Sequence, residues 1–177
     1  FELVVSLVDS NELEQGKVNR SMQVVEVGEL VRRTAEGYRA RAEKKGIELI
    51  IDVRQNYALI DSTKFIQITE NLISNAIKFS PHHRKIYITI GSVVQGMVRL
   101  SVRDEGEGIA PEEMHKLFAK FERLQAQPTG GEHSTGLGLS IVKQLAELMN
   151  GRVWCESVYG EGATFSAEFP EYDLTQE

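Results

Sequence analysis

The sequence predicts an α/β two-layer sandwich, in which a layer of helices packs on a β-sheet. Short runs with alternating apolar and polar side chains occur in both halves of the chain, and such alternation is typical of half-buried strands. Longer segments between these runs carry apolar residues at helical spacing. The chain has 177 residues, the size of one domain, so strands and helices are expected to share one core.

The first elements follow from local signals. Apolar residues at positions 1, 4, 5 and 8 lie on one helical face. We interpret residues 1 to about 14 as the end of a longer helix whose partner is missing, the alternative being a terminal helix docked on its own domain. The next expected elements are a strand at 22–27, a helix at 29–45 that Gly46 closes, and strands at 47–53 and 57–60 joined by a polar turn.

The remaining elements begin with a long helix. Asp61 or Ser62 can cap its first turn, and Pro81 ends it after Phe79. The loop at 125–134 is polar, contains glycines and lacks periodicity, which predicts a mobile lid. The other expected elements are a hairpin of strands 86–94 and 97–102, a short helix begun by Pro111, a helix at 140–149, and strands at 152–158 and 163–169.

Composition and charge exclude several classes of protein. The net charge of -6 argues against a nucleic-acid-binding face, which needs a basic patch. No apolar run approaches the ~18 residues of a membrane span, so we expect no membrane contact by this segment. The single cysteine, Cys155, fits a reducing cytoplasm, and the histidines show no zinc-ligand spacing. Because the chain begins at Phe1 rather than Met, we expect a piece of a longer protein, which could itself be membrane-anchored.

The helix at 64–79 carries an unusual polar stripe. At about 100° per residue, its polar residues fall within a stripe about 100° wide, and nearly all other positions are apolar. A solvated face usually carries Glu, Lys or Arg, because Asn and Ser are poor helix formers. Here Asn71 and Asn75 offer neutral oxygen ligands for a hard cation, and Lys78 offers a charge for phosphate. The stripe consists of Lys64, Gln67, Asn71, Ser74, Asn75 and Lys78.

Two glycine-containing turns add weaker signals. Asp104-Glu105-Gly106-Glu107-Gly108-Ile109 follows a strand, where glycines allow a ligand close to the backbone and a carboxylate can accept from an amine. Thr135-Gly136-Leu137-Gly138-Leu139 enters a helix, whose first N–H groups can bind an anion. Pro111 breaks the dinucleotide-binding fingerprint in the first turn, and Leu137-Gly138 replaces the Lys-Ser/Thr of a P-loop in the second.

The order of these motifs resembles the catalytic ATP-binding domain of sensor histidine kinases. The resemblance covers about residues 21–169. It rests on Asn71–Phe79 (the N box), Asp104–Gly108 (the G1 box), Phe118 and Phe121 (the F box), Thr135–Leu139 (the G2 box) and the late element Gly160–Phe165. It implies a Bergerat-type fold, a mixed sheet backed by helices, with ATP between the sheet and a flexible lid.

The resemblance also implies a role for each matching residue. Asn75 would ligate Mg²⁺ on the phosphates with Asn71 beside it, and Lys78 would touch a phosphate. Asp104 would accept the adenine amino group, with Thr164 supporting the base through water. The other implied nucleotide contacts are Gly106, Gly108, Ile109, Gly136, Leu137, Gly138 and Leu139, and Phe118, with Phe121, would anchor the lid, although plain core packing explains these phenylalanines equally well.

Asn71 separates this sequence from other branches of the superfamily. The related gyrase, mismatch-repair and heat-shock chaperone ATPases have a glutamate there that activates water, whereas an amide cannot take a proton. Glu70 is turned about 100° away from the stripe. The site is therefore expected to present the γ-phosphate to an outside acceptor rather than to water.

The acceptor histidine of the family is absent from this sequence. We therefore expect three parts: residues 1–17 as the end of a dimerisation helix hairpin, 18–170 as the catalytic domain, and 171–177 as a tail. The implied partners are an upstream histidine-bearing dimerisation domain and a response regulator receiver domain, in a homodimeric parent. The alternatives are a nucleotide-binding regulatory module without kinase activity, such as a pseudokinase or an anti-sigma-like protein, and, third, a gyrase-type ATPase.

Overall fold

The computed structural model describes residues 21–93, 96–122, 124, 126–132 and 136–176. The expected helix end at 1–17 and Thr135 of the second glycine turn lie outside the described residues. No helix in the described ranges is both long and apolar enough to cross a bilayer.

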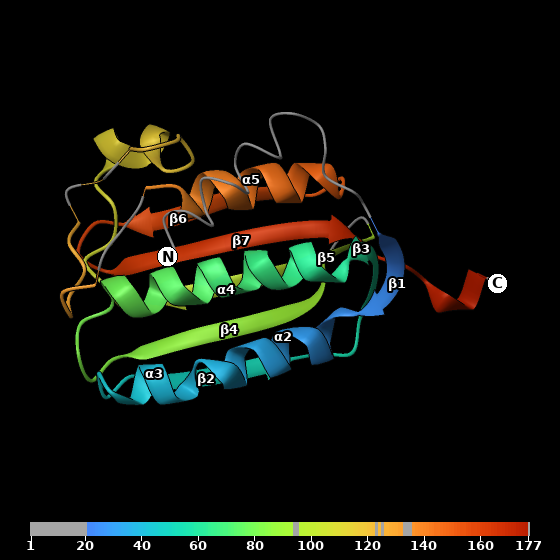
Figure 1. The fold of residues 1–177 in the computed structure, drawn as a ribbon, viewed down its shortest axis with the longest axis horizontal. Coiled ribbons are helices and arrows are strands. Elements are labelled where there is room, and N and C mark those ends of the chain that lie inside the picture. Colours follow the sequence, from blue (N-terminus) through green and yellow to red (C-terminus); the bar gives the residue numbers. More distant parts are fainter. Residues whose placement is uncertain (1–20, 94–95, 123, 125, 133–135, 177) are drawn as a thin grey trace.

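A five-stranded mixed sheet forms one layer of the domain (Figure 1). Its strand order is β2-β4-β5-β7-β6; β2 and β4 are parallel, and the other neighbouring pairs are antiparallel. This arrangement confirms the α/β class and the Bergerat-type mixed sheet. The strands are β2 (Glu48–Val53), β4 (Lys85–Val93), β5 (Met97–Asp104), β6 (Arg152–Val158) and β7 (Gly162–Pro170).

The helices form the second layer, on one face of the sheet (Figure 1). The core lies between the layers, where Phe65 and Leu72 of α4 and Leu100 of β5 are at most 1% exposed. Burial of such side chains contributes roughly 1.5–3 kcal/mol each. The helices are α2 (Val27–Gly37), α3 (Arg39–Glu43), α4 (Ser62–Phe79) and α5 (Gly138–Leu148).

The helix expected at 29–45 is two helices. It begins earlier than expected because the Glu26 side chain accepts hydrogen bonds from the N–H groups of Gly28 and Glu29. It breaks after Gly37, where the Tyr38 N–H bonds to the Ala35 carbonyl, because glycine is a poor helix former. The short helix α3 then leads to Gly46, whose φ of +64° fits the expected helix end.

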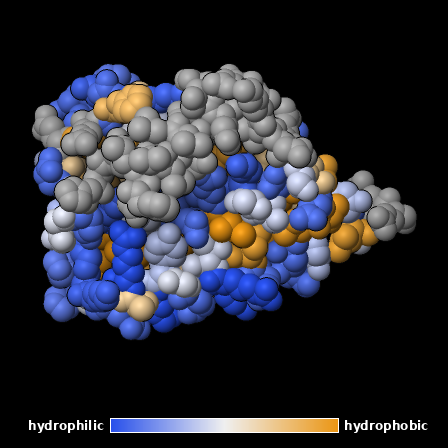
Figure 2. Space-filling model, viewed as in Figure 1, coloured by the Kyte–Doolittle hydropathy of each residue, from blue (hydrophilic) through white to orange (hydrophobic). Residues whose placement is uncertain are grey.

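The strand at Tyr57–Asp61, β3, does not pair with β2. It pairs antiparallel with β1 (Met22–Glu26) in a separate two-stranded sheet. Figure 2 shows hydrophobic residues gathered at this end of the molecule, where Val24 and Leu59 are 42% and 44% exposed. The segment begun by Pro111 is a 3₁₀ helix, η1 (Pro111–Lys116), and a second short one, η2, spans Leu174–Gln176.

Candidate functional site

The polar stripe of α4 faces a cavity of about 800 Å³. Asp61 fixes the start of this helix, since its side chain accepts from the N–H groups of Thr63 (3.1 Å) and Lys64 (3.2 Å). With the apolar side of α4 buried in the core, the opposite side is left for the cavity. The stripe residues that line it are Gln67, Asn71, Ser74, Asn75 and Lys78.

The two asparagines are held differently. The Asn71 Nδ2 donates to the Gln67 carbonyl at 2.9 Å, and its Oδ1 lies toward α5. A Cβ added to Gly138 would lie 2.8 Å from that oxygen, so only glycine fits the first residue of α5 without displacing Asn71. Asn75 lines the cavity, and no side-chain partner joins it within the described ranges, which leaves its amide oxygen for a ligand.

The cavity can supply only a partial set of metal ligands. The described part of the chain contains no group of three or more His, Cys, Asp or Glu side chains able to hold a metal ion. Magnesium, however, usually keeps several waters and takes few protein ligands when it also binds substrate phosphates. The amide oxygen of Asn75 therefore fits a cation brought by a phosphorylated ligand better than a resident metal.

Asp104 lies at the end of β5 and lines the same cavity, only 6% exposed. Burial raises the pKa of this carboxyl, and hydrogen bonds from the backbone N–H groups of Gly106 (2.8 Å) and Ala163 offset part of that rise. A carboxylate has about four acceptor positions, so capacity remains for a donor in the cavity. An N–H or O–H donor of a ligand, such as an amino group, would satisfy it.

The turn after Asp104 is packed against backbone on both sides. A Cβ on Gly106 would lie 2.7 Å from the Phe79 carbonyl, and one on Gly108, at φ +76°, would lie 2.6 Å from the Val158 carbonyl. Ile109 N–H donates to Ser157 Oγ at 2.9 Å, which ties the turn to β6. Gly108 and Ile109 line the cavity, whereas Gly106 does not.

The second glycine turn closes the other side of the cavity. Gly136, at φ +71°, accepts a hydrogen bond from the Phe121 N–H at 3.0 Å through its carbonyl. Gly136, Gly138 and Leu139 line the cavity. Leu137 is fully buried and does not line it.

Thr164 is absent from the lining of the cavity. Ala163 and Phe165 line the cavity, and because side chains alternate along a strand, Thr164 between them faces the opposite side of β7. Ala163, which also donates to Asp104, is the residue of this element at the cavity. Phe118 packs against the core and is likewise absent from the lining, while Phe121 is 63% exposed.

The cavity extends further than the sequence pattern indicated. Tyr38 reaches it from the break between α2 and α3, Arg41 reaches it from α3, and Lys116 reaches it from η1. Arg41 is half-buried, with no hydrogen bond or ion pair to any other described residue. In the sequence, Gly37 is the only signal for this wall of the cavity. The helix expected to be continuous over 29–45 gives no indication that Tyr38 and Arg41 line a cavity.

Glu70 also differs from its expected position. The helical wheel turns it away from the stripe, yet it lines the edge of the cavity and is exposed. The lining of α4 therefore spans more than the predicted 100° stripe, and a carboxylate does lie beside Asn71.

Comparisons with known proteins agree with this geometry. The model of the family described as histidine kinase-, DNA gyrase B- and HSP90-like ATPases matches residues 60–173. The circadian input-output histidine kinase CikA of Synechococcus elongatus is 30% identical over 180 residues, covering 99% of this chain and 24% of the relative. The sensor histidine kinase WalK of Bacillus subtilis is 35% identical over 118 residues, covering 66% of this chain and 19% of the relative.

Solved structures of histidine kinases are also similar to this chain. Full-length ShkA, crystallised in complex with AMPPNP, superposes with a TM-score of 0.84 and 32% identity, covering 98% of this chain and 36% of that chain. The nucleotide-free catalytic domain of the histidine kinase ThkA gives 0.74 and 27%, with 85% and 96% covered. The chain thus spans a quarter or less of the two curated relatives above, but nearly all of an isolated catalytic domain.

Proposed function

Because the chain belongs to the histidine kinase-, DNA gyrase B- and HSP90-like ATPases, as a catalytic ATP-binding domain of the histidine kinase type, we propose that it binds Mg-ATP and donates the γ-phosphate to a histidine on an upstream dimerisation helix of a longer protein. One observation carries the proposal: a single cavity joins Asp104 to the amides and the lysine of α4. The first suits an amino-substituted base, and the second suits phosphates with a cation.

The residues of the cavity fit the two ends of ATP. At the base end, Asp104 accepts the adenine amino group, beside the close backbone of Gly108. At the phosphate end, Lys78 supplies a charge, and the backbone near Gly138 at the start of α5 adds N–H donors. Asn75 would hold the magnesium ion, whose charge would offset that of the phosphates.

The chain's own part in the transfer is to position the nucleotide. Phosphoryl transfer needs chiefly alignment and charge stabilisation, and the amide of Asn71 cannot take a proton from water. Glu70 is the carboxylate on α4 that lines the cavity, and its side chain is exposed at the edge. We expect it to leave hydrolysis slow, because a carboxylate exposed at the edge of the cavity is not held against a water at the γ-phosphate.

The setting of the domain belongs to the same proposal. Residues 18–170 form the catalytic unit, residues 1–17 the end of a dimerisation hairpin, and residues 171–177 a tail. The parent protein is a homodimer in the cytoplasm or anchored to a membrane with this domain in the cytoplasm. Its phosphohistidine passes the phosphoryl group to the receiver domain of a response regulator. The names of the relatives, which are sensor histidine kinases, support this setting.

A transfer experiment tests the proposal. The domain is mixed with the histidine-bearing helices of its parent and γ-labelled ATP, and acid-labile label on those helices is measured. Kinase function predicts labelling that Asn75→Ala abolishes and that Glu70→Gln leaves in place. Saturable ATP binding without labelled histidine would contradict the kinase proposal and favour a regulatory module. Steady phosphate release by the domain alone, lost in Glu70→Gln, would favour a gyrase-type ATPase.

A further inference from the structure

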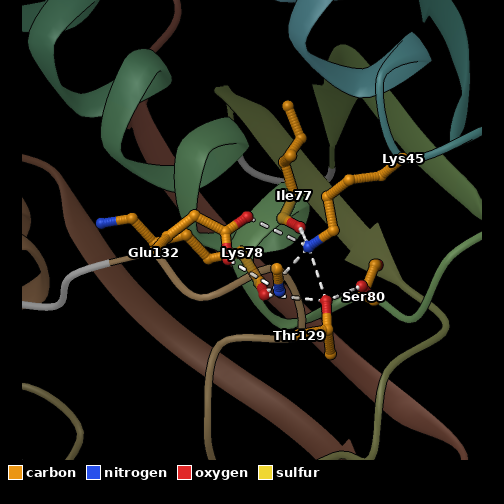
Figure 3. Close-up of polar contacts among 7 residues, drawn as sticks. Lys45, Ile77, Lys78, Ser80, Thr129 and Glu132 are labelled. Carbon is orange, nitrogen blue, oxygen red and sulfur yellow. Dashed lines mark hydrogen bonds and ion pairs between the residues drawn. The ribbon is translucent and has the colours of Figure 1, made fainter.

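Lys45 carries a buried cation that no motif of the sequence pointed to. It precedes Gly46 at the end of the α3 segment, and the residue is only 7% exposed. Figure 3 shows its ammonium group between the last turn of α4 and the loop that contains Thr129 and Glu132. Its Nζ bonds to the carbonyls of Ile77 (2.7 Å) and Lys78 (3.3 Å), to Thr129 Oγ1 (2.5 Å) and to Glu132 Oε1 (3.2 Å).

The helix side of this network explains why a cation is tolerated there. The last carbonyls of a helix lack intrahelical partners and carry the negative end of its dipole. Lys45 satisfies two of them at the end of α4. A buried ammonium is costly without an opposite charge, and Glu132 supplies one at 3.2 Å.

The loop that contains Thr129 and Glu132 is attached to the same end of α4. Thr129 N–H donates to the Lys78 carbonyl at 2.9 Å, and its hydroxyl donates to the Ser80 carbonyl at 2.5 Å. Gly130 N–H donates to Glu132 Oε2 at 2.9 Å. Burial alone would raise the pKa of the Glu132 carboxyl, but hydrogen bonds from backbone N–H groups and Lys45 hold it below its usual range. Glu132 is therefore charged at neutral pH and pairs fully with the ammonium.

The attached loop forms a wall of the cavity. Residues 126–129 and Glu132 line it, as do Lys78 and Phe79 at the end of α4. Lys45 itself is absent from the lining. Lys45 therefore contacts the end of α4 and the 126–132 loop from outside the cavity. These contacts set the distance between the helix end and the loop.

We propose that Lys45 is a positioning residue for the nucleotide, which fixes the 126–132 wall against the Lys78 end of α4 through Thr129 and Glu132. The effect on nucleotide rests on the proposed function, whereas the attachment of the loop does not. Without the ammonium, Glu132 loses its counter-ion and Thr129 loses a donor, so the wall separates from α4. The cavity then holds ATP less tightly, although no group that touches ATP has been changed.

The test compares three substitutions, two of them with matched controls. Lys45→Met keeps the aliphatic stem and removes the charge, and Lys44→Met is its control, since Lys44 is an exposed neighbour outside the network. Thr129→Val removes the hydroxyl at constant shape, and Thr129→Ser restores it. Glu132→Gln removes the counter-charge only. The measurements are hydrogen exchange of the Thr129 and Gly130 amides without nucleotide, ATP affinity by calorimetry, and thermal unfolding.

We expect exchange at these amides to be at least tenfold faster in Lys45→Met and Thr129→Val, and ATP affinity to fall about tenfold. Lys44→Met and Thr129→Ser should match the unsubstituted domain. Unchanged exchange in the folded Lys45→Met and Thr129→Val proteins would overturn the attachment of the loop. Faster exchange with full ATP affinity would overturn the positioning role.

Two further outcomes need to be distinguished: a variant that does not fold, and a domain that does not bind ATP. If Lys45→Met does not fold, Thr129→Val and Glu132→Gln test the same wall with the helix-side contacts intact. If the unsubstituted domain does not bind ATP, the proposed function and the positioning role fail together. The exchange data then still decide whether Lys45 holds the loop.

Discussion

The proposed contact between Asp104 and the adenine amino group makes the sharpest prediction. The perturbation is Asp104→Asn, which keeps the shape of the side chain and an oxygen that can accept from Gly106 N–H. The new amide presents its own N–H₂ group to the cavity, where it opposes the amino group of adenine. The variant should fold at neutral pH, because burial raises the pKa of Asp104 and makes its charge costly to hold there.

The expected magnitude follows from the burial of Asp104, which is 6% exposed. A hydrogen bond to a charged group contributes about 1.5–3 kcal/mol, and each ~1.4 kcal/mol changes affinity tenfold. Asp104→Asn should therefore weaken ATP binding by about 10- to 150-fold. A purine nucleotide without the amino group should bind the unsubstituted domain with a similar loss. Combining the two changes should cost little more than either alone.

The assay is calorimetric titration of both nucleotides into both proteins, with Asp52→Asn as control. Asp52 is an exposed carboxylate on β2 outside the cavity, so its loss should leave all affinities unchanged. Acidification provides a second check, since binding needs the ionised carboxylate. Because the pKa of Asp104 is raised, the loss of ATP binding on acidification should begin at a higher pH than for an ordinary aspartate, whose pKa is about 3.9. If Asp104→Asn still discriminates between the two nucleotides as strongly as the unsubstituted domain, the assignment of Asp104 is wrong.

Three other changes have expected outcomes. Gly108→Ala places a Cβ 2.6 Å from a backbone carbonyl at φ +76°, which should cost about 2 kcal/mol and lower Tm by about 4–8 °C in thermal unfolding. Glu168→Gln should cost about 1–3 kcal/mol in urea unfolding at pH 7, since this buried carboxylate pairs with Arg99 and Arg152. Burial alone would raise the pKa of Glu168, but the two arginines outweigh burial and bring the pKa below its usual value. The difference in stability between Glu168→Gln and the unsubstituted domain should therefore disappear as the pH falls below about 4.3 and through this lowered pKa. Asn75→Ala should weaken Mg-ATP binding about tenfold and leave adenosine binding unchanged in calorimetry, as expected for one lost oxygen ligand.

The sequence predicted most of the fold because its signals were local. Asp61 caps α4 as expected, and the hairpin through Gly96 and the strands on either side of Gly160 lie where alternation indicated. The pairing of β3 was not predictable in this way. Its partner β1 lies more than 30 residues earlier, and no local signal distinguishes that partner from β2.

The residues predicted from the helix lie at the cavity, whereas one predicted from a strand does not. Asn71, Asn75 and Lys78 came from helical periodicity, and all three line the cavity. Thr164 was assigned from its place in a motif, but strand alternation puts Ala163 at the cavity. The wall formed by Tyr38 and Arg41 depends on a break in a helix, which one glycine signals only weakly.

The two ends of α4 are fixed by charged side chains from other parts of the fold, and this explains how a buried helix can present a precise polar face. Asp61 holds the first turn through backbone N–H groups, and Lys45 holds the last turn through backbone carbonyls. Apolar packing alone tolerates a small rotation or slide of a helix, whereas charged groups at both termini allow little of either. A rotation of 20° would move an amide about 6 Å from the helix axis by about 2 Å, enough to lose a ligand contact. We therefore expect the placement of Asn71 and Asn75 to depend on Asp61 and Lys45, which belong to no nucleotide-binding motif.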